Sequence, residues 1–246
     1  MKHILCLLFF LSLTTVDLAA AIHNIKEYGA IGDGKHIDSP AINAAIEAAA
    51  QNGGGTVYIP TGKYACYSIR LKSHLTIYLE AGAEIIAAFP TQTEGYDEAE
   101  ENPHNLYQDF GHSHWKNSLM WGIGLEDVTI CGPGLINGKG LTREESRLPG
   151  VGNKAISLKL CKNVILKDFS MLHCGHFALL ATGVDNLTIH NLKVDTNRDG
   201  FDIDCCRNVR ISDCSVNSPW DDAIVLKASY ALGFFRDTEN VTINGC

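Results

Sequence analysis

Three carboxylates near the end of the sequence are spaced so that they could act together. Asp199 lies in "NRDGFDID", and Asp221 and Asp222 lie in "SPWDDAIVLK", 22 and 23 residues further on. Like charges that share a site raise the pKa of at least one of them. Such a group could divide into a general acid and a base for glycosidic cleavage, or it could bind Ca²⁺ through its oxygens. The third interpretation is structural, with the aspartates accepting backbone hydrogen bonds at corners of the chain.

A repeated phrase sets the period that would bring these carboxylates together. In each copy Asn or Asp precedes an apolar residue, and Ile or Leu follows two positions later. The steps between successive copies from Val164 are 23, 22 and 32 residues, so the last one contains an insertion. The copies are "SHLTI" at Leu75 (a looser one), "EDVTI" at Val128, "KNVIL" at Val164, "DNLTI" at Leu187, "RNVRI" at Val209 and "ENVTI" at Val241.

Short alternating strands at this period, with no helical stretch between them, predict a solenoid. Leucine-rich repeats have a similar length, but their consensus and their helical return segments are missing. We therefore expect an all-β fold, a right-handed parallel β-helix with coils of about 22 residues. Residues one coil apart would lie about 4.8 Å apart on neighbouring strands, which would place Asp199 beside Asp221 and Asp222.

Asparagines recur immediately before the strands of this repeat, at Asn163, Asn186, Asn208 and Asn240. Asn tolerates the left-handed conformation that tight corners require. Stacked from coil to coil, the amides could also hydrogen-bond along the axis as a ladder. We expect these four residues to mark the same corner of successive coils.

One amphipathic helix is expected in "DSPAINAAIEAAAQNGGG", just ahead of the first strand, "TVYIP". Ser39 is placed to act as the N-cap, with Pro40 at the first helical position and Gly53 just past the end. Its apolar face would consist of Ile42, Ala45, Ile46 and Ala49. Such a helix could cover the open end of the solenoid, where unpaired strand edges would otherwise be exposed.

Residues 90–118 are polar and aromatic with little periodicity, which predicts a long excursion from one coil. Excursions of this kind often build one wall of a binding groove. His112 and His114 lie within it, but two histidines without a matching third ligand are weak support for a metal site. We expect both to be exposed loop histidines.

The first 21 residues have the layout of a secretory signal peptide: Lys2 and His3, an apolar run from Ile4 to Leu13, and a small-residue site at Ala19–Ala21. The expected domain is therefore 22–246, working in a periplasm or outside the cell. The formal charge of −8 argues against a nucleic-acid partner, and no later stretch is long enough to span a membrane. Cys161, Cys205 and Cys214 lie in or beside apolar runs, where buried thiols are more common than disulfides.

Two segments resemble glycoside hydrolase family 28, the polygalacturonases and rhamnogalacturonan hydrolases of the pectin lyase-like superfamily. The first is Asn197-x-Asp199-Gly200 followed by Asp221-Asp222-Ala223-Ile224, and the second is the N-terminal "YGAIGDGKHIDSPAINAAIEAAAQNGGGTVYIPTGKY". The resemblance implies a parallel β-helix that hydrolyses galacturonan or rhamnogalacturonan with inversion. It implies that Asp221 is the general acid and that Asp199 and Asp222 activate the attacking water. We expect a monomer with no metal or cofactor.

The sequence also departs from that family. Arg198 stands where the family usually has Thr, and it could contact a uronate carboxylate. Beyond Asp222 the sequence contains neither the Gly-His-Gly nor the Arg-x-Lys on which the family depends, which predicts the N-terminal part of a longer enzyme.

Three further residues are candidates for substrate binding. His176 lies 23 residues before Asp199 and is expected in the same column. Trp220 could stack on a sugar ring. Lys227 follows Asp222 by five residues, so strand alternation would put it on the opposite face unless the chain bends.

Two other functions remain open from the sequence. One is a Ca²⁺-dependent polysaccharide lyase of the same architecture, although no column of Arg or Lys is visible to act as the base. The other is a non-catalytic solenoid that binds carbohydrate or acts at a surface.

Overall fold

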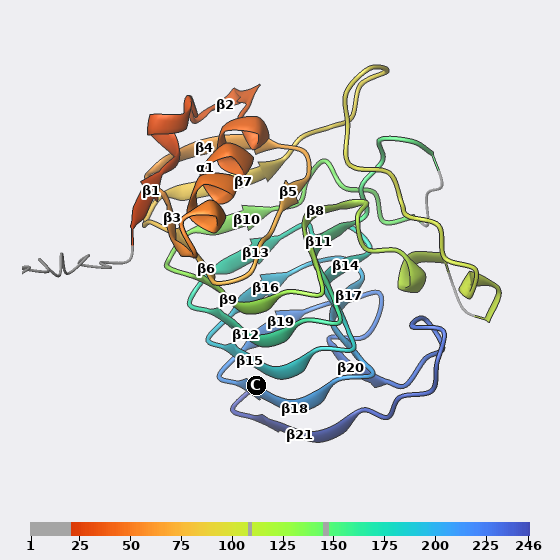
Figure 1. Ribbon diagram of the computed structural model, residues 1–246. Coiled ribbons are helices and arrows are strands. Elements are labelled where there is room, and N and C mark those ends of the chain that lie inside the picture. Colours follow the sequence, from red (N-terminus) through yellow and green to blue (C-terminus); the bar gives the residue numbers. More distant parts are fainter. Residues whose placement is uncertain (1–20, 108–109, 145–147) are drawn as a thin grey trace, which may run out of the picture.

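The computed structural model describes residues 21–107, 110–144 and 148–246 (Figure 1). Three parallel sheets wind around one axis, and successive strands of the chain pass from the first sheet to the second and then to the third. This is the expected right-handed parallel β-helix. The first sheet contains β1 (Ile22–Asn24), β3 (Gly55–Ile59), β6 (Leu75–Leu79), β9 (Glu126–Cys131), β12 (Lys162–Lys167), β15 (Asp185–His190), β18 (Arg207–Ser212) and β21 (Glu239–Asn244).

The other two sheets complete each coil. The second contains β2 (Asp33–Ile37), β4 (Gly62–Cys66), β7 (Ala83–Ala87), β10 (Leu135–Asn137), β13 (Ser170–Leu172), β16 (Lys193–Asp195) and β19 (Ser215–Asn217). The third contains β5 (Ile69–Arg70), β8 (Ser118–Ile123), β11 (Lys154–Lys159), β14 (Phe177–Thr182), β17 (Asp199–Asp204) and β20 (Ile224–Lys227).

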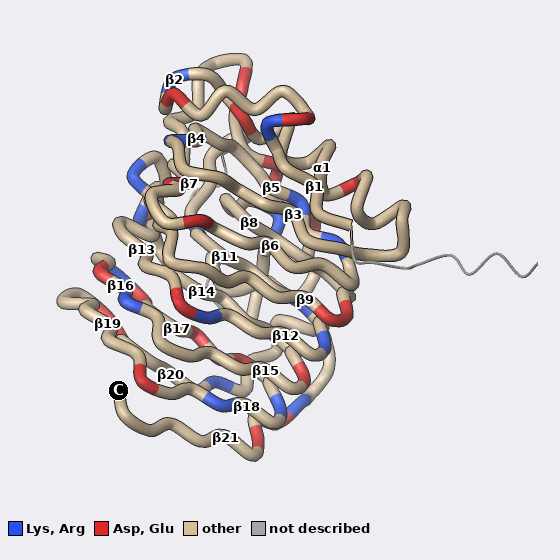
Figure 2. The backbone as a smooth tube through the Cα atoms, turned by 90° about the vertical axis from the view of Figure 1, so that its left-hand side faces the viewer, with Lys and Arg blue, Asp and Glu red and all other residues tan. Residues whose placement is uncertain are grey.

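The repeated phrase forms the first sheet, in register. Val164 pairs with Val128 on one side and with Leu187 on the other. Leu187 pairs in turn with Val209, and Val209 with Val241. Because these side chains point inward, each coil adds one apolar layer to a continuous core. Figure 2 shows Lys and Arg interspersed with Asp and Glu along the outside of the coils.

The asparagine ladder predicted from the sequence is present. Asn240 donates through Nδ2 to Asn208 at 2.6 Å, Asn208 to Asn186 at 3.1 Å, and Asn186 to Asn163 at 2.8 Å. Asn163 donates to Asp127 at 2.8 Å and so extends the ladder by one coil. All five residues have positive φ, between 55° and 57°. The same corner therefore needs the left-handed conformation in every coil and satisfies the amides along the axis.

Helix α1 (Ser39–Gln51) lies across the first coils, as expected for a cap (Figure 1). It does not precede the first strand, because β1 and β2 come before it and pair with β3 and β4. The apolar face predicted for it is fully buried. The cap assignment was wrong by one residue: the N-cap is Asp38, and Ser39 is the first helical residue. Asp38 instead accepts hydrogen bonds from the backbone N–H groups of Ile31 and Gly32, at 2.6 and 3.0 Å. A short 3₁₀ helix, η1 (Ile25–Tyr28), packs beside α1.

The long excursion runs between β7 and β8 and contains the 3₁₀ helices η2 (Asn105–Tyr107) and η3 (Phe110–Ser113). It lies against the outer face of the third sheet. Trp115 is fully buried there and donates through Nε1 to Thr182 Oγ1 at 3.1 Å. The backbone oxygen of Trp115 accepts from Ser157 Oγ at 2.5 Å and from Ser118 Oγ at 2.7 Å. The outer face of β8, β11, β14 and β17 is consequently covered rather than open.

This cover corrects the prediction of exposed histidines. His114 is buried, and only 12% of the His112 side chain is exposed. His112 packs edge-to-face on Phe177 of the third sheet, with the ring centroids 4.8 Å apart. His114 is held within the excursion, where its Nδ1 lies 2.6 Å from Glu100 O.

The cysteines of the described ranges behave as core residues. Cys161, Cys205 and Cys214 are buried and unpaired, as predicted, and so are Cys66, Cys131, Cys174 and Cys206, whereas Cys246 is exposed and unpaired. No helix within the described ranges is long and apolar enough to cross a membrane. The expected signal peptide, 1–21, lies outside the described residues apart from its last position.

Candidate active site

The three carboxylates meet at the end of the third sheet, as their spacing predicted. Asp199 begins β17, and Asp221 and Asp222 lie in the turn before β20. Phe201 pairs with Ile224, an offset that brings Asp222 beside Asp199. Each of the three carboxylates has an oxygen within 4.8 Å of an oxygen of each other one. The register of the coils therefore brings these three residues to the same place.

Two small residues allow the turn to approach β17 so closely. Gly200 N donates to Asp222 O at 2.9 Å, and a Cβ on Gly200 would lie 2.2 Å from Ala223 O. Ser218 Oγ donates to Arg198 O at 2.5 Å and lies 3.1 Å from Asp221 O. A larger residue at position 200 would push the turn away and separate the carboxylates.

Asp199 is the carboxyl of the cluster that holds a proton. Its side chain is buried, and this burial raises its pKa from 3.8 to about 7. The neighbouring charge of Asp221 acts in the same direction, and that of Asp202 adds to it, while Lys227 opposes them. Asp199 is therefore protonated over most of the range below neutral pH.

Asp221 is held in the opposite state. Burial alone would raise its pKa, but hydrogen bonds from Arg198, the Asp222 amide and Asp199 outweigh that effect, and the pKa of Asp221 is lowered. Arg198 Nη2 lies 2.7 Å and Nε 3.2 Å from Asp221 Oδ2. Two adjacent carboxyl groups thus have pKa values pushed in opposite directions, the arrangement that supplies both an acid and a base.

Arg198, expected to contact a substrate carboxylate, binds Asp221 in this structure. About a third of its side chain is exposed, 35%. It lines an open cleft of about 350 Å³ together with Arg143, Glu144, Trp220 and Asp221. Trp220 is 75% exposed, so its ring is accessible from that cleft.

The cleft continues toward the earlier coils. A second hollow of about 340 Å³ lies beside it, and the two share Arg143. The second hollow is also lined by Lys139, His173 and Asn197. In a chain with a net charge of −8, basic side chains gather where the carboxylate cluster opens to solvent.

His176 does not lie where its spacing predicted. Phe177, not His176, pairs with Asp199, so His176 lies one residue out of that column and opposite Arg198. Its side chain is only 1% exposed. Nδ1 lies 2.8 Å from the backbone oxygen of Arg143 and must therefore donate to it. Burial, with Arg198 nearby, lowers the pKa of His176 to about 4, so the ring is neutral at pH 7 and its Nε2 is a buried acceptor.

Lys227 lies on the same side of the sheet as the carboxylates. The turn before β20 bends the chain, so the simple alternation from Asp222 was wrong for this residue. Lys227 Nζ lies 2.5 Å from Asp202 Oδ2 and 2.6 Å from His112 Nε2. It contacts the wall behind Asp199 rather than the open cleft.

Sequence reasoning missed the polar residues buried behind the cluster. Asp202 and Asp204 are both fully buried on the outer face of β17. Asp204 accepts from Ser229 N at 2.8 Å and from Ser229 Oγ at 2.5 Å. The alternation in "DGFDID" contained the signal, because two aspartates on one face of an apolar strand require partners.

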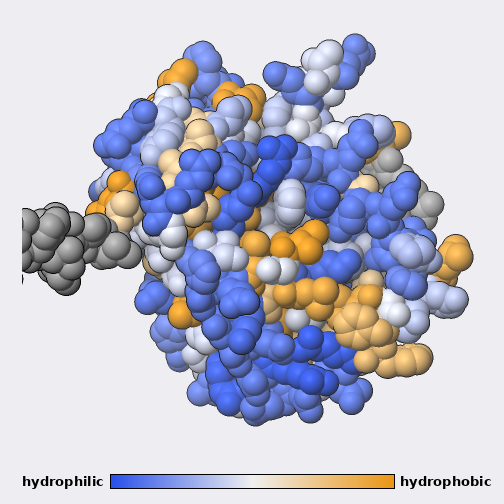
Figure 3. Space-filling model, viewed as in Figure 1, coloured by the Kyte–Doolittle hydropathy of each residue, from blue (hydrophilic) through white to orange (hydrophobic). Residues whose placement is uncertain are grey.

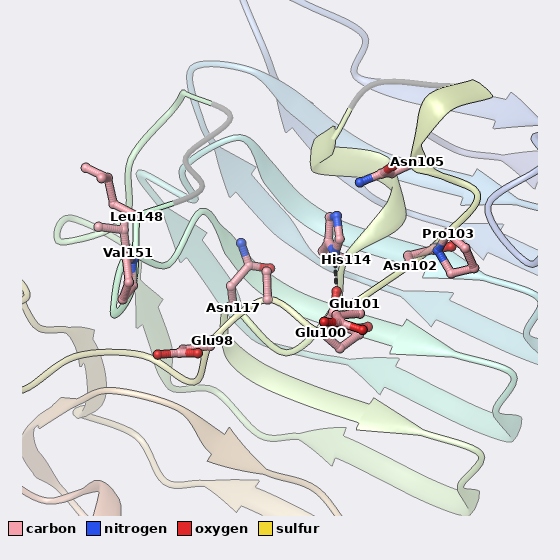
Figure 4. Close-up of a pocket in the computed structure, with 12 residues that line it drawn as sticks. Glu98, Glu100, Glu101, Asn102, Pro103, Asn105, His114, Asn117, Leu148 and Val151 are labelled. Carbon is pink, nitrogen blue, oxygen red and sulfur yellow. Dashed lines mark hydrogen bonds between the residues drawn. The ribbon is translucent and has the colours of Figure 1, made fainter.

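A separate cavity of about 580 Å³ lies between the excursion and 148–151 (Figure 4). Its lining is acidic and amide-rich, with Glu98, Glu100, Asn102 and Asn117 among the residues that Figure 4 labels. Glu100 holds this wall together, since its carboxylate accepts from the backbone N–H of Trp115 at 3.1 Å. The three clustered carboxylates do not line this cavity.

Two groups of side chains could by distance hold a metal ion: Asp199 with Asp221 and Asp222, and Asp199 with His112 and Asp202. The charges fit a metal poorly. Asp199 holds a proton below neutral pH, Arg198 is paired with Asp221 of the first group, and Lys227 is paired with Asp202 of the second. The arrangement is better suited to proton transfer than to ligation.

The comparisons with known proteins agree with this fold. The family described as "Rhamnogalacturonase A/epimerase, pectate lyase-like" matches residues 22–109. An exo-poly-alpha-D-galacturonosidase of Dickeya chrysanthemi is 26% identical over 238 residues, which cover 94% of this chain and 36% of that protein. The family 28 exopolygalacturonase structure of Yersinia enterocolitica superposes with a TM-score of 0.74 at 21% identity, covering 92% of this chain and 49% of that one.

A protein whose name describes a different role is also similar. The plasmin and fibronectin-binding protein A of Streptococcus pneumoniae is 32% identical over 177 residues, 68% of this chain and 23% of that protein. The chain spans half or less of the length of the curated relatives it matches. Together with the three parallel sheets, these similarities show that the chain is a pectin lyase-like parallel β-helix with distant polygalacturonase relatives.

Proposed function

We propose that this protein is a polygalacturonase-like glycoside hydrolase that cleaves α-galacturonosyl linkages in pectic polysaccharide. The observation that carries the proposal is the cluster of Asp199, Asp221 and Asp222, in which neighbouring carboxyl groups have pKa values shifted in opposite directions. Hydrolysis of a glycosidic bond needs one carboxyl group to protonate the leaving oxygen and a carboxylate to activate water or stabilise charge.

The cleft beside the cluster supports an acidic sugar as the substrate. Arg143, Arg198 and Lys139 could face carboxylate groups of a galacturonan or rhamnogalacturonan, and the exposed Trp220 ring could stack on a sugar. The named activities of the Dickeya and Yersinia relatives point to the same substrate class.

The roles within the cluster need one refinement. The family resemblance makes Asp221 the acid, whereas in the free protein the proton resides on Asp199. The two side chains are hydrogen-bonded to each other, so they titrate as a pair that shares one proton. We propose that this pair supplies the proton and that Asp222, on the exposed side, helps to hold the attacking water.

The experiment measures reducing-sugar release from polygalacturonic acid and rhamnogalacturonan by the purified protein. Asp221→Asn and Asp199→Asn should each lose more than about a hundredfold in kcat. Asp237→Asn, which changes an exposed carboxylate outside the cluster, is the matched control and should keep full activity. Unchanged turnover in Asp221→Asn would exclude this site.

A substrate with an activated leaving group, such as a nitrophenyl galacturonide, then identifies the acid. A good leaving group does not need protonation, so the variant that lacks the acid should cleave this substrate far better than it cleaves the polymer. If Asp199→Asn is the rescued variant, the role that the resemblance gives to Asp221 is incorrect.

The stereochemistry is a separate test. The resemblance implies inversion, which usually requires carboxyl groups about 6.5–9.5 Å apart, whereas these carboxylates have oxygens within 4.8 Å of each other. We propose inversion, with the exposed Asp222 leaving room for water. Proton NMR of the first product anomer checks this, and a retained anomer would contradict inversion without affecting the hydrolase proposal.

One alternative has specific support. The streptococcal relative favours a non-catalytic surface solenoid, which would bind ligand but show no turnover in the wild type. The assay also tests the Ca²⁺-dependent lyase left open by the sequence, because a lyase would form an unsaturated, ultraviolet-absorbing product and lose activity with chelator.

We also propose that the protein is exported, to a periplasm or beyond, on the basis of its N-terminal sequence. N-terminal sequencing of the protein from its host should find a mature end near Ile22. Recovery of the intact N-terminus in the cytoplasmic fraction would exclude export.

A further inference from the structure

A cluster of three charged or titratable side chains, centred on the buried Asp202, lies directly behind the candidate site. It joins Lys227 of β20, Asp202 of β17 and His112 of η3. Lys227 Nζ is 2.5 Å from Asp202 Oδ2 and 2.6 Å from His112 Nε2, and the histidine nitrogen is 3.2 Å from the same carboxylate oxygen. Three segments that are distant in the sequence therefore meet at one ammonium group.

The hydrogen-bonding groups of this cluster show that Lys227 donates to both of the other side chains. An ammonium group only donates hydrogen bonds, so His112 Nε2 accepts and its ring proton lies on Nδ1. Asp202 is completely buried, and a buried carboxylate is very costly without a cation beside it. Lys227 is that cation, and at the same time it connects the excursion to the sheet.

Two members of this cluster, His112 and Asp202, lie close to Asp199, which is one of the three candidate catalytic residues. His112, Asp199 and Asp202 each offer an atom within 4.8 Å of the other two. The charges that face Asp199 come from every side: Asp221 and Asp222 from the turn, Asp202 from its own strand and Lys227 from β20. Lys227 lowers the pKa of Asp199, against its burial and the two nearest carboxylates.

We propose that Lys227 is a positioning residue: its ammonium group holds Asp202 and His112 in place behind Asp199 and supplies the positive charge that faces this buried part of the site. This inference rests on the hydrolase function proposed above. It differs from the substrate-binding role expected from the sequence, because Nζ already binds two side chains in the wall.

The test uses Lys227→Met and Lys227→Arg in the full protein, with Lys193→Met as the matched control, since Lys193 is an exposed lysine on the neighbouring β16. The alkaline limb of the pH profile of kcat/KM should move upward by about one pH unit in Lys227→Met. Its kcat should fall at least tenfold with little change in KM. Lys227→Arg should restore most of kcat, and Lys193→Met should change neither quantity.

A second variant makes a prediction of opposite sign. Asp202→Asn keeps the shape of the side chain and removes a negative charge that raises the pKa of Asp199. The titration of Asp199 should therefore move downward in Asp202→Asn and upward in Lys227→Met. This variant keeps the inference testable if Lys227→Met fails to fold.

A direct titration separates this inference from the proposed function. Carboxyl resonances of carbon-13-labelled Asp, with Asp199 assigned from Asp199→Asn, report the proton on Asp199 whether or not the protein cleaves a glycan. A wild type without turnover would overturn the hydrolase proposal alone. A higher KM in Lys227→Met with an unmoved Asp199 titration would show that Lys227 binds substrate, and an unmoved titration in both variants would equally overturn its positioning role.

Discussion

At the scale of single residues, the site depends on two neighbouring aspartates with different protonation: Asp199 has a raised pKa and Asp221 a lowered one. Asp199 is buried beside other carboxylates, whereas Asp221 binds Arg198. Burial is the main cause of the raised pKa of Asp199, and charged side chains on its own and the adjacent coil add to it or oppose it. The state of the pair should therefore be visible in both activity and stability.

Activity should fall as the pH rises through about 7, because Asp199 then loses its proton. The pH profile of kcat/KM on polygalacturonic acid measures this. An alkaline limb far above 8 in the wild type would contradict the assignment of the proton to Asp199.

The same profile tests the partner of Asp221. Arg198→Gln removes the cation that lowers the pKa of Asp221, so the acidic limb of the profile should move to higher pH.

The free energy of unfolding should depend on pH because of the raised pKa of Asp199. Asp199 ionises near 3.8 when unfolded and near 7 when folded, so between these values the folded protein binds more protons and its stability decreases as pH rises. Asp199→Asn stays neutral and should gain up to about 4 kcal/mol over the wild type at pH 8, and almost nothing at pH 3. Urea unfolding at both pH values checks this, and Asp237→Asn should show no such difference.

At the scale of elements, the corners of the coils are held by the asparagine ladder. Asn208 combines a left-handed φ of 57° with hydrogen bonds to Asn186 and Asn240. Asn208→Gly keeps the backbone conformation and loses the hydrogen bonds, whereas Asn208→Ala loses both. We expect costs of about 1 kcal/mol for Gly and about 2 kcal/mol for Ala. Chemical denaturation measures the difference, and equal costs would mean that the backbone conformation contributes nothing.

The excursion between β7 and β8 is anchored by Trp115. Its ring is fully buried against the third sheet and its Nε1 donates to Thr182. Trp115→Ala should cost about 3–5 kcal/mol of stability and release the excursion. Limited proteolysis should then cut within 88–117, while Trp115→Phe should protect it. Cutting elsewhere first would mean that the excursion is held by other contacts.

On the scale of the whole molecule, the chain is a stack in which each coil contacts mainly its neighbours. Loops from distant coils still meet on one side: Asn102 of the excursion donates to Ala231 O at 3.0 Å, and Tyr107 packs on Tyr230 at 5.4 Å. In the view shared by Figures 1 and 3, apolar surface lies toward the lower right, over the β20–β21 connection. Phe235, which belongs to this connection, is 92% exposed.

A stack of this kind should lose stability locally. Ile46 of α1 is fully buried over the first coils, and Ile46→Ala should remove about 2–5 kcal/mol there. Hydrogen exchange should then accelerate in β1, β3 and β6 and stay unchanged in β15 and β18. Uniform acceleration through all coils would show that the molecule unfolds as a single cooperative unit.

The sequence by itself determined the architecture and the meeting of the three carboxylates. Both follow from one number, the length of the coil, because parallel strands in register place residues one period apart side by side. The asparagine corners, the buried face of α1 and the clustering of Asp199 with Asp221 and Asp222 were all readable in this way. His176 was misplaced because the step from its coil to the next is 22 residues at Phe177, and a shift of one residue changes the column.

Only the tertiary structure decided which charges face the carboxylates. Lys227 reaches Asp202 because the turn before β20 bends, and His112 arrives from an excursion that has no periodicity to place it. The pairing of Arg198 with Asp221 likewise depends on the side-chain directions of two long groups. Spacing fixes where backbone atoms stack, but the protonation of a buried carboxyl group depends on every charge around it, and those charges come from segments that the repeat does not control.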